Sequence, residues 1–323
     1  MVSDENRTRE LQAATLEAGD GLRVTVLNYG ATLRGLEVPG IDGPIDAVLS
    51  YPRDEDYLTD AFYLGSTVGP YANRIAGACF ELDANTFDLE ANEVPSGNCL
   101  HGGRTGLHQR VFDMQRDEQG LKVECHAHLA DGAGGFPGNR SVSVVYQLLD
   151  EHTLAIDFSV ETDRDTVVSL ANHAYFSFGG PLAEHEIRIL ADEYTPVDDA
   201  MIPTGEIRSV AETEFDLRTL QALGDRQFDH NFVLSSTADG ARPAAQLRLA
   251  ATGVHMNMYT TQIGLQLYTG DYLVTPFAPR RGLCLEAQAF PDAPNQPGFP
   301  SARVAAGSRY WQRSIFEFST IDL

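Results

Sequence analysis

Lysine is nearly absent from this sequence. Lys122 is the single lysine among 23 lysine and arginine residues, which face 46 acidic residues and leave a formal net charge of −23. A surface of this sign repels nucleic acid and anionic lipid, so we expect neither as a partner. Two explanations of the lysine deficit stay open, a genome rich in G and C or a salt-adapted cytoplasm. Activity measured across a potassium chloride series would separate them.

Long apolar runs and paired cysteine motifs are also lacking. No stretch reaches the roughly 18 uncharged apolar residues of a membrane span. Residues 1–20 are polar and acidic, unlike a secretory signal, so we expect a cytoplasmic protein. The scattered cysteines form no C-x-x-C pair, and we expect them to be reduced core residues: Cys79, Cys99, Cys125 and Cys284.

What the sequence does contain is a series of short apolar runs with period-two alternation. SVSVVYQL, residues 141–148, places Val142, Val144 and Tyr146 on one face, as a half-buried strand requires. Similar runs are LRVTVLNYG, LKVECHAHL, LAIDFSVET, AAQLRLAAT and GLQLYTG, and turn-forming clusters such as DGAGGFPGN separate them. This pattern is typical of many antiparallel strands in a sandwich or barrel.

Helical signals are few. DLRTLQALGD, residues 216–225, predicts a short helix with Asp216 as N-cap and Gly224 as its stop. Residues 4–18 are rich in Glu, Leu and Ala, and we leave open whether they form a helix, an edge strand or a frayed terminus. Neither a repeat nor a linker divides the chain, so we expect one all-β domain over residues 1–323.

Polar residues interrupt the apolar pattern in five segments: GPYANRIAG with Asn73 and Arg74, LHGG with His101, SLANHAYF with Asn172 and His173, FDHNF with Asp229, and GLCLEAQAF with Glu286. Each residue alone is more often a satisfied core or surface residue than a site. A carboxylate in a buried strand is costly, however, unless something binds to it. A carboxylate and an imidazole can act as base and acid near neutral pH, while Arg, Asn and Asp bind hydroxyl groups. Together they suit a sugar pocket.

Other kinds of site are disfavoured. His126 and His128 have the spacing of two metal ligands on one strand face, but no third ligand is evident nearby, so we expect no metal. The motifs G-x-x-x-x-G-K-[ST] and G-x-S-x-G are absent.

Taken together, the motifs resemble those of the aldose 1-epimerases, or galactose mutarotases. The resemblance covers nearly the whole chain, through LNYGATLRGLEVPG, GPYANRIAG, LHGG, DGAGGFPGN, NHAYFSFGG, YTPVDDAMIPTGEI, FDHNF, LQLYTG and CLEAQAFPDAPNQPGFPS, in the family's order. It implies a large antiparallel β-supersandwich with few short helices. It also implies an enzyme that interconverts the anomers of free aldoses such as glucose and galactose, without metal or organic cofactor.

The resemblance also implies residue roles. Glu286 matches the catalytic base, His173 the catalytic acid and His101 the second active-site histidine. The matches to sugar-binding positions are Arg74, Asn73, Asp229, Tyr175 and Gln288. We expect an aldose as the partner of a monomer or homodimer. Two alternatives stay open: an epimerase of sugar 6-phosphates, which would need extra cations at its pocket, and a non-catalytic carbohydrate-binding module on the same fold.

Overall fold

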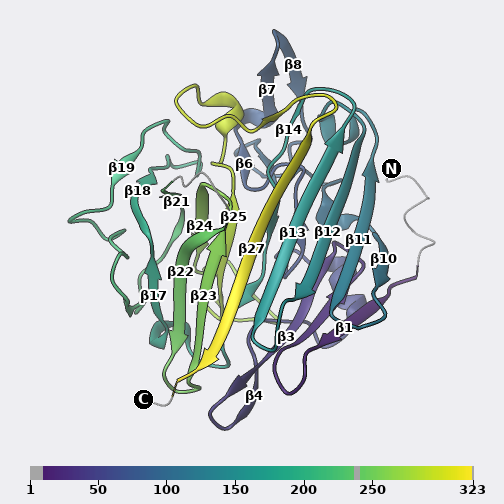
Figure 1. Cartoon of the computed structure of the whole chain (residues 1–323). Coiled ribbons are helices and arrows are strands. Elements are labelled where there is room, and N and C mark those ends of the chain that lie inside the picture. Colours follow the sequence, from purple (N-terminus) through teal and green to yellow (C-terminus); the bar gives the residue numbers. More distant parts are fainter. Residues whose placement is uncertain (1–9, 236–240, 322–323) are drawn as a thin grey trace.

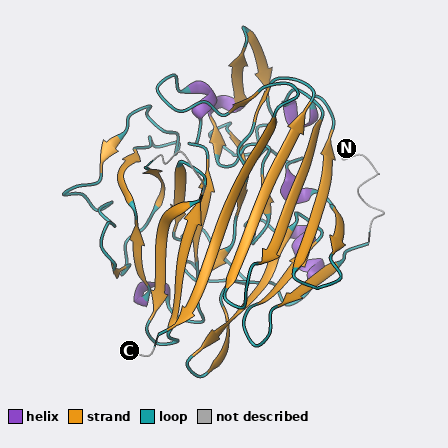
Figure 2. Ribbon diagram, viewed as in Figure 1, coloured by secondary structure: helices purple, strands orange, loops and turns teal. Residues whose placement is uncertain are grey.

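The computed structural model describes residues 10–235 and 241–321, and antiparallel strands are its main regular structure (Figures 1 and 2). The helices among these residues are short 3₁₀ turns: η2 (Asp54–Thr59), η3 (Ala76–Ala78), η4 (Leu107–Gln109), η5 (Ala133–Gly135), η6 (Leu182–Glu184) and η7 (Ala293–Asn295). The prediction of few short helices is confirmed.

The largest sheet has nine strands, whose long members run side by side across the front of Figure 1. Their order across the sheet is β10 (Asp113–Arg116), β11 (Lys122–Leu129), β12 (Arg140–Leu148), β13 (Thr153–Thr162), β27 (Arg309–Thr320), β23 (Val254–Thr260), β22 (Arg242–Leu249), β17 (Glu186–Ile189) and β20 (Gln221–Ala222). Each neighbouring pair is antiparallel.

Two smaller sheets complete the sandwich. The four-stranded sheet has the order β1 (Ala13–Glu17), β2 (Arg23–Leu27), β3 (Thr32–Gly40) and β4 (Gly43–Asp46). The six-stranded sheet has the order β16 (Tyr175–Phe176), β25 (Leu283–Gln288), β24 (Gly264–Tyr268), β21 (Asp229–Leu234), β18 (Ala191–Thr195) and β19 (Arg208–Ser209).

Four two-stranded pairs lie in the connections between the sheets. They are β5 (Thr67–Val68) with β15 (Ala171–Asn172), β6 (Arg74–Ile75) with β9 (Cys99–Leu100), β7 (Cys79–Leu82) with β8 (Asn85–Asp88), and β14 (Thr166–Val167) with β26 (Arg303–Val304). β5, β15, β6 and β9 matter most for function, because they carry or adjoin three of the interrupted segments.

One apolar core joins the three sheets. It contains Val24 of the four-stranded sheet, Val144 of the nine-stranded sheet and Leu285 of the six-stranded sheet, all almost completely buried. Burial of such side chains is worth about 1.5–3 kcal/mol each, before the entropy of ordering the chain is counted. The large sheet therefore packs against the two smaller ones, and the predicted all-β supersandwich is confirmed. That residues 1–323 form one domain stays a prediction.

β12 follows the alternation read from its sequence. Val142, Val144 and Tyr146 are buried, whereas Ser141 is exposed and Ser143 and Val145 are partly so. The three cysteines Cys99, Cys125 and Cys284 are buried, Cys79 is half-buried, and all four thiols are free. Among the described residues, no helix has the length and apolarity needed to cross a bilayer.

The predicted helix over residues 216–225 is wrong. The Asp216 carboxylate binds the guanidinium of Arg218 in a tight turn, at 2.7 Å, and Gln221 and Ala222 pair with β17 as β20. Sheet pairing at this edge outweighs the modest helix propensity of the segment. Of the alternatives for residues 4–18, the edge strand holds for the described part, because β1 is the edge of its sheet. Residues 4–9 lie outside the described residues.

Candidate active site

A cavity of about 430 Å³ brings together side chains from segments far apart in the chain. Seven of the eight residues predicted for the site line it: Asn73, Arg74, His101, His173, Tyr175, Asp229 and Glu286. They come from β6 and the residue before it, from the turn after β9, from β16 and the turn before it, and from β21 and β25. The five interrupted segments therefore converge at one place.

The floor of the cavity includes strands β21, β24 and β25. Their register places Asn231, Gln266 and Glu286 opposite one another. Glu286 lies two residues before the end of β25 rather than at its end, and its side chain is only 2% exposed. Oε2 of Glu286 and Oε1 of Gln266 are buried without a hydrogen-bond partner. A buried acceptor without a partner is costly, and Glu286 lines the cavity, so its unpaired oxygen is placed to accept from a ligand's hydroxyl group.

His173 reaches Glu286 from the turn between β15 and β16. Its backbone N–H donates to the Ser66 carbonyl, and its carbonyl accepts from Gly65 N–H, both at 2.9 Å. Nε2 of its ring lies 3.8 Å from Oε1 of Glu286, and Nδ1 lies 3.5 Å from Sγ of Cys284. The predicted acid and base therefore lie side by side, slightly beyond hydrogen-bond distance of each other, and both line the cavity.

His101 is held by the backbone of Asn73. The Asn73 N–H donates to Nδ1 of His101 at 3.1 Å, and the His101 N–H donates to the Asn73 carbonyl at 3.0 Å. His101 itself has φ 53°, and the glycine after it is required, because a Cβ at Gly102 would lie 2.2 Å from the Gly69 carbonyl oxygen. Since Nδ1 accepts, neutral His101 carries its proton on Nε2 and is a hydrogen-bond donor.

Arg74 lies between two carboxylates. Nε donates to Glu93 at 2.9 Å, and a terminal nitrogen lies 3.6 Å from Oδ2 of Asp229. Asp229 in turn accepts a 2.6 Å hydrogen bond from Nε2 of Gln266. Sequence reasoning missed Glu93 and Gln266, because an acid in a turn and an amide in a strand carry no signal of their own.

Burial controls the charges of the central pair. Removal from water raises the pKa of Glu286 well above its usual value, nearby Asp229 raises it further, and Arg74 lowers it. Burial lowers the pKa of His173 to about 4. Both shifts favour the uncharged forms, as expected when a charge loses its hydration.

Aromatic rings form one wall of the cavity. The Tyr63 ring centroid lies 4.6 Å from that of His101 and 5.7 Å from that of His173. Tyr175 lies 5.1 Å from His173, and its hydroxyl donates to the Phe62 carbonyl at 3.1 Å. Tyr268 also lines the cavity. Tyr63 and Tyr268 were not predicted, since isolated tyrosines are common in cores.

Two residues singled out in the sequence lie elsewhere. Gln288 is completely buried in β25 and does not line the cavity, although it shares a strand face with Glu286. Asn172 fixes the backbone, because its amide donates to the Gly65 carbonyl at 2.8 Å. It therefore holds the turn that carries His173.

One nitrogen from each histidine and one Glu286 oxygen lie within 4.8 Å of one another, close enough to raise the question of a metal ion. The hydrogen bonding argues against it for His101. Because its Nδ1 accepts from a backbone N–H, its Nε2 holds a proton, and a protonated nitrogen cannot bind a metal. The absence of a metal cofactor stays a prediction.

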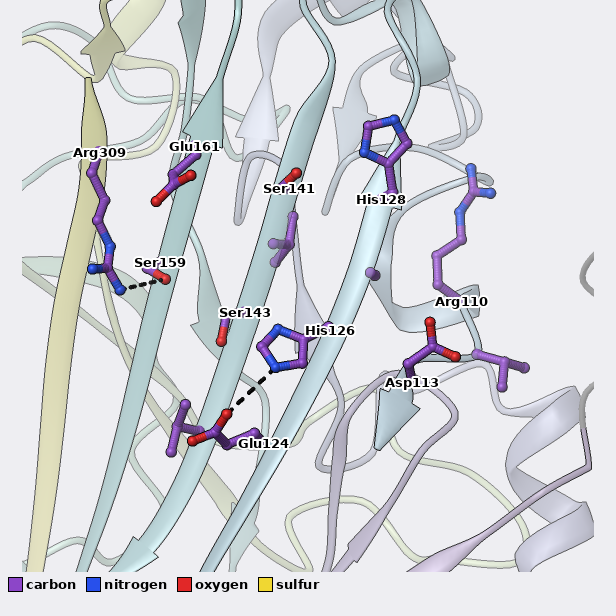
Figure 3. A pocket seen from close by; sticks show the side chains of 14 residues that line it. Arg110, Asp113, Glu124, His126, His128, Ser141, Ser143, Ser159, Glu161 and Arg309 are labelled. Carbon is purple, nitrogen blue, oxygen red and sulfur yellow. Dashed lines mark hydrogen bonds and ion pairs between the residues drawn. The ribbon is translucent and has the colours of Figure 1, made fainter. Parts of the chain in front are cut away.

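A second and larger hollow, of about 820 Å³, lies on the solvent-exposed face of the nine-stranded sheet (Figure 3). We call it the trough. It contains His126 and His128 of β11, with Nε2 of His126 3.5 Å from Glu124, and Arg309 donating to Ser159 at 3.2 Å. None of the eight predicted site residues lines it.

Residues 12–317 match the family model described as aldose 1-epimerase. Galactose mutarotase of Bos taurus is 37% identical over 96% of both chains, and aldose 1-epimerase of Escherichia coli K12 is 34% identical over 94% of both. An aldose epimerase homologue from C. elegans superposes with a TM-score of 0.91 at 28% identity, covering 97% of this chain and 100% of the other. This chain belongs to the aldose 1-epimerase family.

Proposed function

We propose that this protein interconverts the α and β anomers of a free aldose, with Glu286 as general base and His173 as general acid. The observation that carries the proposal is the 3.8 Å approach of Nε2 of His173 to Oε1 of Glu286, inside a cavity that also holds Arg74 and Asp229. The curated relatives are named galactose mutarotase and aldose 1-epimerase, which supports the same reaction.

The reaction begins with proton transfer at the anomeric carbon. The Glu286 carboxylate takes the proton of the C1 hydroxyl, a carbonyl forms at C1, and the C1–O5 electron pair moves to O5. O5 takes a proton from His173. Rotation about C1–C2 then presents the other carbonyl face, and the same two groups reverse the steps to close the opposite anomer. Each well-placed acid or base contributes about a hundred- to ten-thousand-fold to the rate.

The reactive pair must be charged, whereas burial favours neutral Glu286 and neutral His173. The two forms contain the same number of protons, so they differ by one proton moved from the carboxyl group to the imidazole. Hydrogen bonds from sugar hydroxyls to the carboxylate would stabilise the charged form. We infer that substrate binding itself brings the pair into its working charge state.

The remaining polar groups would bind the sugar. The proton on Nε2 of His101 would be donated to an oxygen at the reacting end, and Arg74 and Asp229 would hold hydroxyl groups through charge-assisted hydrogen bonds. Asn73 mainly holds His101, and Tyr175 adds a face to the pocket wall. Gln288 lies behind this layer, and we propose no direct contact for it.

The charges around the cavity favour a free aldose over a sugar phosphate. Among the described lining residues, Arg74 is the one arginine or lysine, and four acids line the same cavity: Glu93, Asp199, Asp229 and Glu286. Two of these already bind Arg74. A phosphate would meet repulsion here rather than the cluster of cations it needs.

The proposal is tested by polarimetry of freshly dissolved α-D-glucose and α-D-galactose, with glucose 6-phosphate and a small panel of other aldoses alongside. We expect faster equilibration of the free hexoses and little effect on the phosphate. Binding of a sugar without faster equilibration would instead favour a carbohydrate-binding module. A cytoplasmic location and a monomeric or homodimeric state stay predictions.

A further inference from the structure

The two histidines of the cavity differ in what faces their Nδ1 atoms. Nδ1 of His101 accepts from the Asn73 backbone N–H at 3.1 Å. An N–H can only donate, so this partner fixes the proton of neutral His101 on Nε2. Nδ1 of His173 instead lies 3.5 Å from Sγ of Cys284. A thiol can donate its S–H and can also accept weakly through sulfur, so it does not fix the proton of His173.

Cys284 is placed by the strand that carries Glu286. The two side chains are two residues apart in β25, on one face and roughly 6.5–7 Å apart along the strand. The ring of His173 spans this interval, with Nδ1 toward Cys284 and Nε2 toward Glu286. Cys284 is completely buried, and burial raises the pKa of its thiol well above the usual value, with Glu286 and Asp229 adding to the effect. The sulfur therefore keeps its proton.

We propose that Cys284 is a positioning residue that holds the His173 ring while leaving its proton free to move. This inference rests on the proposed function of His173 as the group that exchanges a proton with the ring oxygen. It concerns a residue that never touches the sugar and acts only through the imidazole.

The thiol suits each state that His173 passes through. In the imidazolium form, Nδ1–H donates to sulfur. After Nε2 gives its proton to the ring oxygen, Nδ1–H still donates to sulfur. If the neutral ring holds its proton on Nε2 instead, the S–H donates to Nδ1. A carboxylate or carbonyl partner would favour only the states with a proton on Nδ1, and a backbone N–H only the state without one.

Several other titratable groups surround the ring, although burial is the main cause of its lowered pKa. They are Glu286 and Cys284 from β25, Tyr268 from β24, Tyr175 from β16, Tyr63 from the loop after η2, His101 from the turn after β9, and His108 from η4. Of these, Cys284 is the group at hydrogen-bond distance of Nδ1.

Three substitutions at Cys284 separate hydrogen bonding from packing. Cys284→Ser keeps a group that both donates and accepts, Cys284→Val keeps apolar volume, and Cys284→Ala keeps neither. We expect kcat to fall about three- to tenfold in the Val and Ala variants with little change in KM, and the Ser variant to stay nearest the parent protein. If the Val variant kept the parent kcat while the Ser variant lost activity, the proposal would be overturned, because packing alone would then explain the effect.

A second measurement reads the ring directly. In ¹⁵N-labelled protein at neutral pH, we expect the side-chain ¹⁵N chemical shifts of His101 to be those of a single neutral tautomer with the proton on Nε2. Those of His173 should show an average of both neutral forms. Cys284→Ala should move the His173 signals and leave those of His101 in place. Cys125→Ser, in the main core, is the matched control and should move neither.

Two results of the second measurement would overturn the proposal: a His173 ring fixed in one form in the parent protein, or His173 signals unchanged by Cys284→Ala. Failure of the parent protein to accelerate mutarotation would instead refute the proposed function. The nitrogen signals would still report whether the thiol pairs with His173.

Discussion

The cavity around Glu286 and the trough around His126 use similar residue types and are built in opposite ways. Most residues of the trough come from adjacent strands of one sheet, on its solvent-exposed face, and the side chain of His126 is 47% exposed. Side chains of the cavity come from segments far apart in the chain, and the central pair is withdrawn from water, with His173 5% and Glu286 2% exposed.

The difference shows why size is a poor guide to chemistry here. The trough is the larger hollow, yet water reaches its charges, and such charges interact weakly. In the smaller cavity, lost hydration shifts the pKa values of a carboxyl and an imidazole in opposite directions, and the same loss strengthens every contact with a bound ligand. The following predictions test this contrast.

Glu286→Gln should have the largest effect. It keeps the shape of the side chain and removes the base, so we expect kcat/KM for mutarotation to fall about a thousandfold or more. Circular dichroism should match the parent protein, because the amide replaces a group that is buried and partly unpaired. A rate within a few-fold of the parent would contradict the assignment.

His173→Asn should follow, with a loss of about a hundredfold, because water can replace the acid in part. Polarimetry under saturating sugar should show the loss mainly in kcat. Asn172→Ala is a useful comparison, since Asn172 holds the same turn without facing the sugar. A loss as large in that variant would mean that backbone placement, not the imidazole, explains the effect.

Asp229→Asn should act more moderately, in two ways. Loss of a sugar contact and of the charge beside Arg74 should raise KM about tenfold. Because the charge of Asp229 raises the pKa of Glu286, its removal should lower that pKa. The acidic limb of the pH–rate profile should therefore move to lower pH, and a shift to higher pH would contradict the electrostatic account.

Buried histidines should make the fold sensitive to acid. Burial lowers the pKa of His108 to about 4, below the unfolded value of about 6.5. Between these values the unfolded chain binds more protons, so stability is present above the upper value and is lost as pH falls toward the lower one. His108 alone should contribute about 1.4 kcal/mol per pH unit in this window. The free energy of unfolding, measured by denaturant titration at several pH values, should fall less steeply with decreasing pH in His108→Asn than in the parent protein. An unchanged pH dependence would refute the prediction.

The smallest effect is expected in the trough. A double variant, His126→Ala with His128→Ala, should keep mutarotation within about twofold of the parent, since exposed side chains away from the site rarely change stability by more than a few tenths of a kcal/mol. The same polarimetric assay serves. A loss comparable to that of Asp229→Asn would mean that the two hollows communicate, and the contrast between them would fail.

Local sequence determined the strands that depend on side-chain alternation and the polar interruptions that form the site. The sequence predicts strands β11, β12 and β13 because apolar and polar residues alternate in them with the period of the backbone pleat. His101, His173 and Glu286 were found because a charged or imidazole group inside an apolar segment is costly unless it has a use. Their roles, and their meeting in one sugar site, came from the resemblance of the motifs to a family.

Only the tertiary structure decided which strands pair and which side chains contact each other. The segment 216–225 has helix signals of its own, yet it forms a turn and β20 because pairing with β17 is available only in the folded chain. Glu93, Gln266, Tyr63 and Cys284 carry no local signal, because each acquires its role from a residue distant in sequence. Burial and pairing depend on what lies across space, so the opposed pKa shifts of Glu286 and His173, and the different partners of the two histidines, follow only from the assembled fold.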